Sequence, residues 1–181
     1  MKKYLFGIGL LAVIGIGVYF IVLLTSPRLG YVRSSDLVNK YAGMQEASVL
    51  YKKKMAQWQS NIDTLESDYQ RSVSKYNLEF SKSNAAVRKE QEILLDKQRQ
   101  NIQQYVKTLD DKAREEDQKM TDGVINQINS FIEEYGKSHQ YDFIFGTTQQ
   151  GNILYGNKGK DITEEVLEAL NRTYKKGEIK K

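Results

Sequence analysis

Few residues of this sequence could perform chemistry together. The 181 residues include no cysteine and one histidine, His139, so the chain can form neither a disulfide nor a zinc–thiolate site. A single imidazole cannot build a metal centre, and no serine has a recognisable triad partner. Residues 156–160, Gly-Asn-Lys-Gly-Lys, look like a phosphate loop but lack the G-x-x-x-x-G-K-[ST] spacing. The sequence therefore predicts no enzyme, no cofactor and no metal.

A second group of residues could act through charge alone. Between positions 71 and 89, five cations face one carboxylate, Glu79, which leaves a net charge of +4. Such a cluster can attract anionic lipid, lipopolysaccharide or acidic segments of another protein, at about 1 kcal/mol per charge near an anionic surface. The alternative is an ordinary solvated helix end. The candidate contact residues are Arg71, Lys75, Lys82, Arg88 and Lys89.

Four large aromatic side chains lie at helical spacing beside these cations. Two roles are open to them. They can close the contact between two packed helices, or some can face an inner cavity as adaptable contacts for a bound protein, because two helices cannot fully bury such large rings. The candidate residues are Trp58, Tyr69, Tyr76 and Phe80.

The element that must position these side chains is a long helical segment. Residues 44–137 contain no proline and two glycines, Gly123 and Gly136. Apolar residues recur at spacings of three and four from Tyr51 to Phe80, with a stutter at Val73. Residues 81–84, Ser-Lys-Ser-Asn, compete with helix, so the turn is expected near 81–85. The sequence thus predicts an antiparallel helical hairpin about 55 Å long.

Short strand-like pieces flank the hairpin. Gly30–Arg33 is expected to form one strand and Tyr141–Phe145 a second, with Asn152–Tyr155 as the returning strand. A short helix follows the first strand, with Gly43 as its C-cap residue. The spacing of Asp161-x-x-Glu164 predicts a capping box that opens a final amphipathic helix.

These elements define an α+β fold with four parts. Residues 1–27 form an N-terminal transmembrane or signal segment, and residues 28–43 supply the first part of a small β-body. Residues 44–137 form the coiled-coil hairpin. Residues 138–181 complete the β-body with two strands and the C-terminal helix.

The N-terminal part predicts export. Lys2 and Lys3 precede an uncharged run, Tyr4–Leu24, that is long enough to cross a bilayer. The run is either a retained anchor or an unusually long signal peptide, and both place residues 28–181 beyond the membrane. The formal charge is +4. Because Lys2, Lys3 and Arg28 supply three of those units, the remainder is nearly neutral and nucleic-acid binding is not expected.

Both ends of the exported part resemble the Skp/OmpH family of periplasmic chaperones. The residues that carry the likeness are Gly30–Ser34, Asp36–Tyr41, Tyr141–Phe145, Ile153–Gly156 and Lys160–Thr163. The resemblance implies a homotrimer whose helical hairpins enclose a cavity. It implies an ATP-independent holdase that keeps unfolded outer-membrane proteins from aggregating in the periplasm. Retention of residues 4–24 would tether it to the inner membrane, and cleavage would leave it soluble in the periplasm.

A different class of function remains open on the sequence. A membrane-anchored coiled-coil spacer or adaptor of an envelope complex also joins an anchor to long helices. The known adaptors carry additional barrel domains, for which too few residues are present outside the hairpin. A stalk needs neither the helix reversal at 81–84 nor the strand pattern at 141–155. Oligomeric state distinguishes the two, since a parallel dimer with an unreversed helix favours the stalk.

Overall fold

The computed structural model describes residues 26–148 and 151–179. The chain divides into two compact units. We call them the hairpin unit (described residues 38–128 and 171–179) and the sheet unit (described residues 26–37 and 129–170). The predicted anchor Tyr4–Leu24 lies outside the described residues. Within the described part, no helix is both long and apolar enough to cross a membrane.

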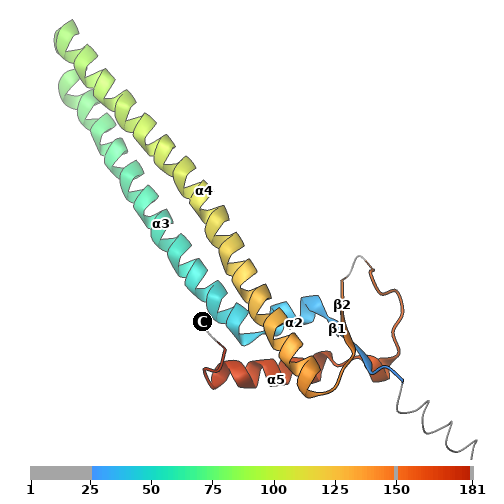
Figure 1. Cartoon of the computed structure of the whole chain (residues 1–181). Coiled ribbons are helices and arrows are strands. Elements are labelled where there is room, and N and C mark those ends of the chain that lie inside the picture. Colours follow the sequence, from blue (N-terminus) through green and yellow to red (C-terminus); the bar gives the residue numbers. More distant parts are fainter. Residues whose placement is uncertain (1–25, 149–150, 180–181) are drawn as a thin grey trace, which may run out of the picture. The chain divides into compact units, whose positions relative to one another are not determined.

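Two long antiparallel helices dominate the hairpin unit (Figure 1). Helix α3 spans Ala42–Lys75 and continues into a π-helix, η1, at Tyr76–Phe80; helix α4 spans Ala85–Ser138. The chain reverses at residues 81–84, where the sequence places the turn. Asn84 begins α4 because its Oδ1 accepts a hydrogen bond from the backbone N–H of Val87, at 3.0 Å.

The seam between α3 and α4 is thin. Helix α4 contributes several large apolar side chains to the hairpin unit. Of these, only Leu109, Val124 and Ile128 are buried. Elsewhere polar contacts join the helices: the Tyr51 hydroxyl donates to the carbonyl of Ala113 at 3.3 Å. Lys54 and Glu116 form a 2.7 Å ion pair. Most of the apolar stripe therefore stays half-exposed, as a two-helix pair without a third element must leave it.

Tyr41 fixes the start of the hairpin. It separates α2 (Ser34–Lys40) from α3 and is fully buried. Its hydroxyl donates to Gln127 Oε1 at 3.0 Å, and its ring meets the Tyr174 ring edge-on at 5.3 Å. The expected C-cap role of Gly43 is wrong. Gly43 lies inside α3, where an added Cβ would stand 2.5 Å from the Tyr41 ring, so glycine is needed for packing.

A two-stranded parallel sheet forms the centre of the sheet unit. Strand β1 (Leu29–Arg33) pairs with β2 (Phe143–Thr147), and the register places Leu29 opposite Phe143. The other edge of β1 is covered by a single bridge between Tyr31 and Asp161. The buried apolar side chains of this unit come from β1, α2, the end of α4, α5 and the residue before α5: Val32, Leu37, Tyr135, Ile162, Val166, Leu167 and Leu170.

The returning strand expected at Asn152–Tyr155 does not form in the described structure. Gly151 turns the chain with a φ of 83°, and the Asn152 side chain closes the loop. Its amide donates to the Gly146 carbonyl at 2.7 Å, and its Oδ1 accepts from the Thr148 N–H at 3.0 Å. This side chain satisfies backbone groups that a ladder would otherwise pair. The segment instead projects outward, with Leu154 93% and Tyr155 87% exposed.

The last helix, α5 (Thr163–Lys175), follows a 3-10 turn, η2 (Lys158–Lys160). The predicted capping box is replaced by a different network. Asp161 Oδ1 accepts the Thr163 N–H at 3.0 Å, whereas Glu164 forms a 3.2 Å ion pair with Arg33. Burial alone would raise the pKa of Asp161, but hydrogen bonds from Thr163 and the Arg33 charge at 3.2 Å hold that pKa below its ordinary value.

Candidate functional site

The predicted cations lie around the turn of the hairpin, and they divide into two groups. Arg71 pairs with Asp68 on its own helix, and Lys75 stands 4.0 Å from Glu79. The other three, Lys82, Arg88 and Lys89, are exposed and form no ion pair within the described residues. The turn therefore presents free positive charge, whereas the charge further along α3 is partly neutralised.

The four predicted aromatic residues are all half-buried. Lys54 lies over the Trp58 ring, with its Nζ 5.5 Å from the ring centroid. The Tyr76 hydroxyl donates to Glu92 Oε1 at 2.6 Å, and this hydrogen bond raises the pKa of Tyr76. Tyr69 and Phe80 also contribute to open grooves between the helices. Each ring thus packs on the seam with one part and faces solvent with another.

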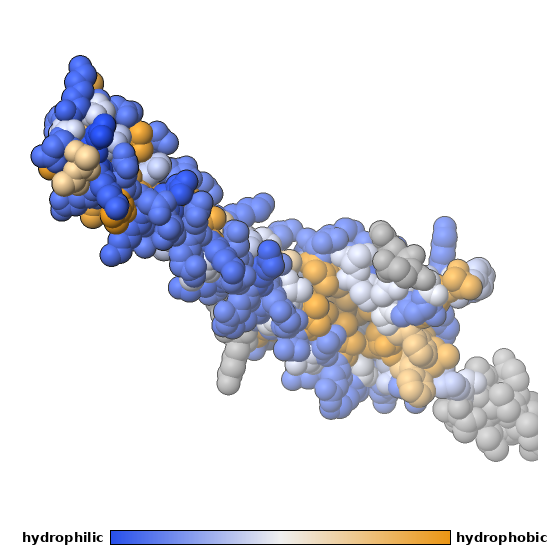
Figure 2. Space-filling view, turned by 90° about the horizontal axis from the view of Figure 1, so that it is seen from above, coloured by the Kyte–Doolittle hydropathy of each residue, from blue (hydrophilic) through white to orange (hydrophobic). Residues whose placement is uncertain are grey.

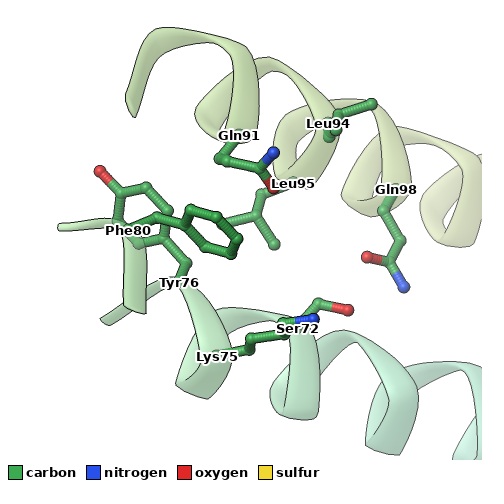
Figure 3. A pocket seen from close by; sticks show the side chains of 8 residues that line it. All are labelled: Ser72, Lys75, Tyr76, Phe80, Gln91, Leu94, Leu95 and Gln98. Carbon is green, nitrogen blue, oxygen red and sulfur yellow. The ribbon is translucent and has the colours of Figure 1, made fainter. Parts of the chain in front are cut away.

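A cleft opens between α3 and α4 beside η1 (Figure 3). Its volume is about 360 Å³. Figure 3 shows side chains from both helices surrounding one open space, with Phe80 projecting between them. Aromatic and aliphatic groups form part of the wall, and amide, hydroxyl and ammonium groups form the rest. The lining residues are Ser72, Lys75, Tyr76, Phe80, Gln91, Leu94, Leu95 and Gln98.

The π-helix explains why the seam opens at this point. The N–H of Ser81 bonds to the carbonyl of Tyr76, five residues earlier, at 3.0 Å. The wider turn changes the direction of the following side chains, so Phe80 no longer continues the α-helical stripe. The stutter in the apolar spacing lies at Val73, three residues before η1. It did not predict a π-helix, because an irregular spacing alone does not specify the hydrogen-bond pattern.

Large apolar side chains stand exposed near the cleft. Leu78 in η1 is 84% exposed, and Ile93 and Leu94 on α4 are 57% and 53% exposed. Figure 2 shows apolar patches, in orange, interrupting the hydrophilic surface. The apolar spacing along the sequence did not single out Leu78 or Ile93. Neighbouring helices decide which side of a stripe is covered, and periodicity does not contain that information.

A second groove lies further along the hairpin, with a volume of about 560 Å³. Tyr69 and Ile102 contribute apolar surface to it, and charged and amide groups form most of its wall, including Asp63, Glu66 and Arg99. This groove is larger than the cleft at η1, and more of its lining residues are charged. The two openings therefore expose apolar and charged groups at two separate places along the hairpin.

His139 belongs to a packing arrangement. Its ring stacks on Tyr135 with the centroids 3.9 Å apart, and its Nδ1 lies 2.9 Å from the Tyr135 carbonyl oxygen. Within the described ranges, no three histidine, aspartate or glutamate side chains come together in a way that could hold a metal ion.

The family model for outer membrane proteins described as OmpH-like matches residues 28–170. The chain belongs to the OmpH-like family. This confirms the resemblance carried by the two ends of the sequence. The OmpH-like α+β fold is also found in a crystal structure of a protein from Caulobacter crescentus CB15, described as a candidate outer membrane chaperone (OmpH-like). The two share 14% identity, with a TM-score of 0.72, over 82% of this chain and 86% of the other. No curated protein matches the sequence significantly.

Proposed function

We propose that this OmpH-like protein is an ATP-independent holdase chaperone, which binds unfolded outer-membrane proteins in the periplasm and prevents their aggregation. One observation carries the proposal: large apolar side chains, led by Leu78, stand exposed on a folded hairpin beside free cations. Isolated exposed apolar residues are common, but here Leu94 lines an open cleft, and Leu78 and Ile93 are exposed on the two helical segments that form it. The family membership and the description of the solved relative support the same role.

Binding in this proposal is the sum of many weak contacts. Fully burying one leucine side chain is worth about 1.5–3 kcal/mol, and each exposed leucine offers part of that to a client. Several such sites on one chain, or on several hairpins, raise the total affinity through effective concentration. Trp58, Tyr69, Tyr76 and Phe80 supply adaptable aromatic contacts, because their half-buried rings retain free surface.

The free cations at the turn extend the proposal to a second contact. Lys82, Arg88 and Lys89, with Lys75 and Arg71 behind them, would attract acidic client segments, anionic lipid or lipopolysaccharide. Because the ionic strength of the solution screens exposed charges, this contribution should fall as salt is added.

We also propose that the chain works as a homotrimer, assembled through the sheet unit. Phe143 and Phe145 on β2 stack on each other at 5.9 Å and are 60% and 45% exposed. Leu154 and Tyr155 add further exposed apolar surface in the same unit. Within the described residues the outer edge of β2 pairs with no strand, and such an edge beside exposed apolar surface favours pairing with another chain. The N-terminal residues 4–24 would tether this assembly to the inner membrane, or their cleavage would release it.

The test uses the full chain reconstituted into lipid nanodiscs, with empty nanodiscs as the control. A urea-unfolded outer-membrane β-barrel protein is diluted into each without ATP, and light scattering is followed. We expect suppression near one client per assembly. Unchanged scattering by a chain that remains helical by circular dichroism would contradict the holdase proposal. Together with a dimeric mass, it would favour the spacer or adaptor function.

A further inference from the structure

We propose that the cleft beside η1 is a discrete subsite for one aromatic side chain of an unfolded polypeptide, followed in sequence by a carboxylate side chain. The inference rests on the proposed chaperone function and deepens it, because it assigns a preferred sequence feature to an otherwise general surface. The cleft is formed by residues of α3, η1 and α4 within the hairpin unit (Figure 3).

The size of the cleft fits one side chain better than a folded element. A volume of about 360 Å³ lies at the lower end of the range for small-molecule pockets. An aromatic ring with its adjoining backbone can enter such a space, whereas a helix about 10 Å across cannot. The occupant is therefore an extended segment that inserts one residue.

The apolar part of the wall is suited to a ring. Tyr76 and Phe80 present aromatic surfaces, which favour edge-on or offset contacts with another ring. Leu94 contributes aliphatic surface that stays 53% exposed while the cleft is open. Gln91 and Gln98 carry amide groups that can donate to and accept from the backbone of an extended peptide. The two sets of groups together match a ring attached to an unpaired backbone.

The charge around the cleft determines which residue is favoured next to the aromatic residue in the bound peptide. Lys75 lines the cleft, and its nearest carboxylate partner, Glu79, is 4.0 Å away, at the limit of an ion pair. The other nearby carboxylate, Glu92, already accepts the Tyr76 hydroxyl at 2.6 Å. Free cations at the turn add to the positive potential. An acidic residue beside the ring is therefore attracted, and a basic one is repelled.

The backbone gives independent support. A π-helix is less favourable than a continuous α-helix and occurs frequently at functional sites. Here η1 contributes Tyr76 and Phe80 to the cleft wall. The hydrogen bond from Tyr76 to Glu92 joins η1 to α4, so the spacing of the two walls is fixed before a ligand arrives. Such preorganisation lowers the ordering cost of binding.

The test titrates the full chain in nanodiscs with an acetylated, amidated decapeptide of glycine and serine that carries one Phe-Glu pair. Phe-Lys and Ala-Glu versions are the peptide controls. Nuclear magnetic resonance follows the side-chain amides of Gln91 and Gln98 and the methyl groups of Leu94. We expect Phe-Glu to bind about tenfold more tightly than either control, with shifts confined to the cleft.

Two variants locate the site. Ser72→Phe fills the cleft and should weaken Phe-Glu binding about tenfold, whereas Ser74→Phe, on an exposed position of the same helix, should leave it unchanged. Lys75→Glu should remove the advantage of Phe-Glu over Phe-Lys, and Lys89→Glu, which does not line the cleft, should retain it. If Ser72→Phe does not fold, the comparison of Lys75→Glu with Lys89→Glu still tests the site.

The outcomes separate this inference from the proposed function. Equal binding of the three peptides, or shifts spread along the whole hairpin, would overturn the subsite even if barrel aggregation is suppressed. A clear Phe-Glu preference without suppression would support the subsite and overturn the holdase function. Loss of binding in Ser74→Phe equal to that in Ser72→Phe would also overturn the assignment to this cleft.

Discussion

Tyr41 shows how one side chain can define an element boundary. It is fully buried, it hydrogen-bonds Gln127, and it occupies the space that Gly43 leaves free. The next residue is held as well, because the N–H of Ala42 donates to Asn171 Oδ1 at 2.7 Å. A tyrosine on an apolar helix face is predictable as a core residue. Its partners on α4 and α5 are not, because they lie about 86 and 130 residues away in the sequence.

We predict that Tyr41 makes stability fall at alkaline pH. Burial and the neighbouring Tyr174 raise the pKa of Tyr41 to about 12. The unfolded chain, with an ordinary tyrosine pKa near 10, therefore loses its proton first. The contribution is fully present below pH 10 and is lost as the pH rises through 12, up to about 2 kcal/mol. Urea unfolding at pH 8 and pH 11 measures it.

Tyr41→Phe is the matched variant, because it keeps the ring and removes the titrating group. It should cost about 1 kcal/mol at pH 8 through the lost hydrogen bond to Gln127. Its further loss of stability at pH 11 should be smaller than that of the native chain. An equal loss in both proteins would show that other tyrosines cause the alkaline effect.

At the scale of elements, the end of α4 carries a local strain. Gln140 adopts a positive φ of 58°, and the N–H of Tyr141 bonds back to the Gly136 carbonyl at 2.9 Å. This is the Schellman arrangement, in which glycine is the usual residue at the left-handed position. The sequence carries no glycine there, so the helix end was predictable only from the change of period after it.

We therefore expect Gln140→Gly to stabilise the protein by about 0.5–1 kcal/mol, because glycine adopts a positive φ without steric cost. Urea denaturation followed by circular dichroism measures the change. Ser130→Gly, at an exposed position within the same helix, is the control and should destabilise by a similar amount. A lower midpoint for Gln140→Gly would contradict the strain argument.

The polar seam of the hairpin leads to a second prediction at this scale. Lys54 and Glu116 join α3 to α4 at 2.7 Å, and both side chains are about two-fifths exposed, so solvent weakens the pair. We expect Lys54→Glu or Glu116→Lys alone to cost less than about 1 kcal/mol, and the double exchange to recover most of the loss. Thermal unfolding of the four proteins measures the coupling; additive losses would show that the ion pair contributes nothing.

The hairpin itself was the most predictable element. Its helices follow from nearly a hundred residues without proline and from the apolar spacing between Tyr51 and Phe80, and its turn follows from the cluster of helix-competing residues at 81–84. The cleft was less predictable. Tyr76, Phe80 and Lys75 were chosen from ring size and charge, whereas Ser72, Gln91 and Gln98 were not. Polar residues on a helix carry no signal of what they face until the partner helix is placed.

At the scale of the whole molecule, the strand expected at Asn152–Tyr155 is the main difference between expectation and structure. The residue pattern favours a strand, but among the residues that the structure describes no strand pairs with it, and Leu154 and Tyr155 remain exposed. Sequence pattern reports whether a segment suits a sheet, and it does not report which chain supplies the neighbouring strand. The proposed trimer gives this surface a role.

We predict that Leu154→Asp with Tyr155→Asp reduces the assembly from three copies to one. The charges would have to be buried without partners in the proposed interface, at a cost of several kcal/mol. Native mass spectrometry of the full chain in detergent micelles measures the mass. Leu78→Asp, at a similarly exposed position on the hairpin, is the control and should remain trimeric. An unchanged mass in the double variant would exclude this surface as the interface.

The parallel pairing of β1 with β2 has a consequence for the order of folding. Arg28 and Asp142, which bond to each other beside the sheet, are 114 residues apart in the chain. Such distant pairings form slowly, because the entropy of closing the loop must be lost before any contact compensates for it. Helices α3 and α4 can form first from local contacts, and their reversal shortens the effective loop. While this chain emerges from its synthesis, β1 must therefore wait unpaired until the whole hairpin and β2 have followed it.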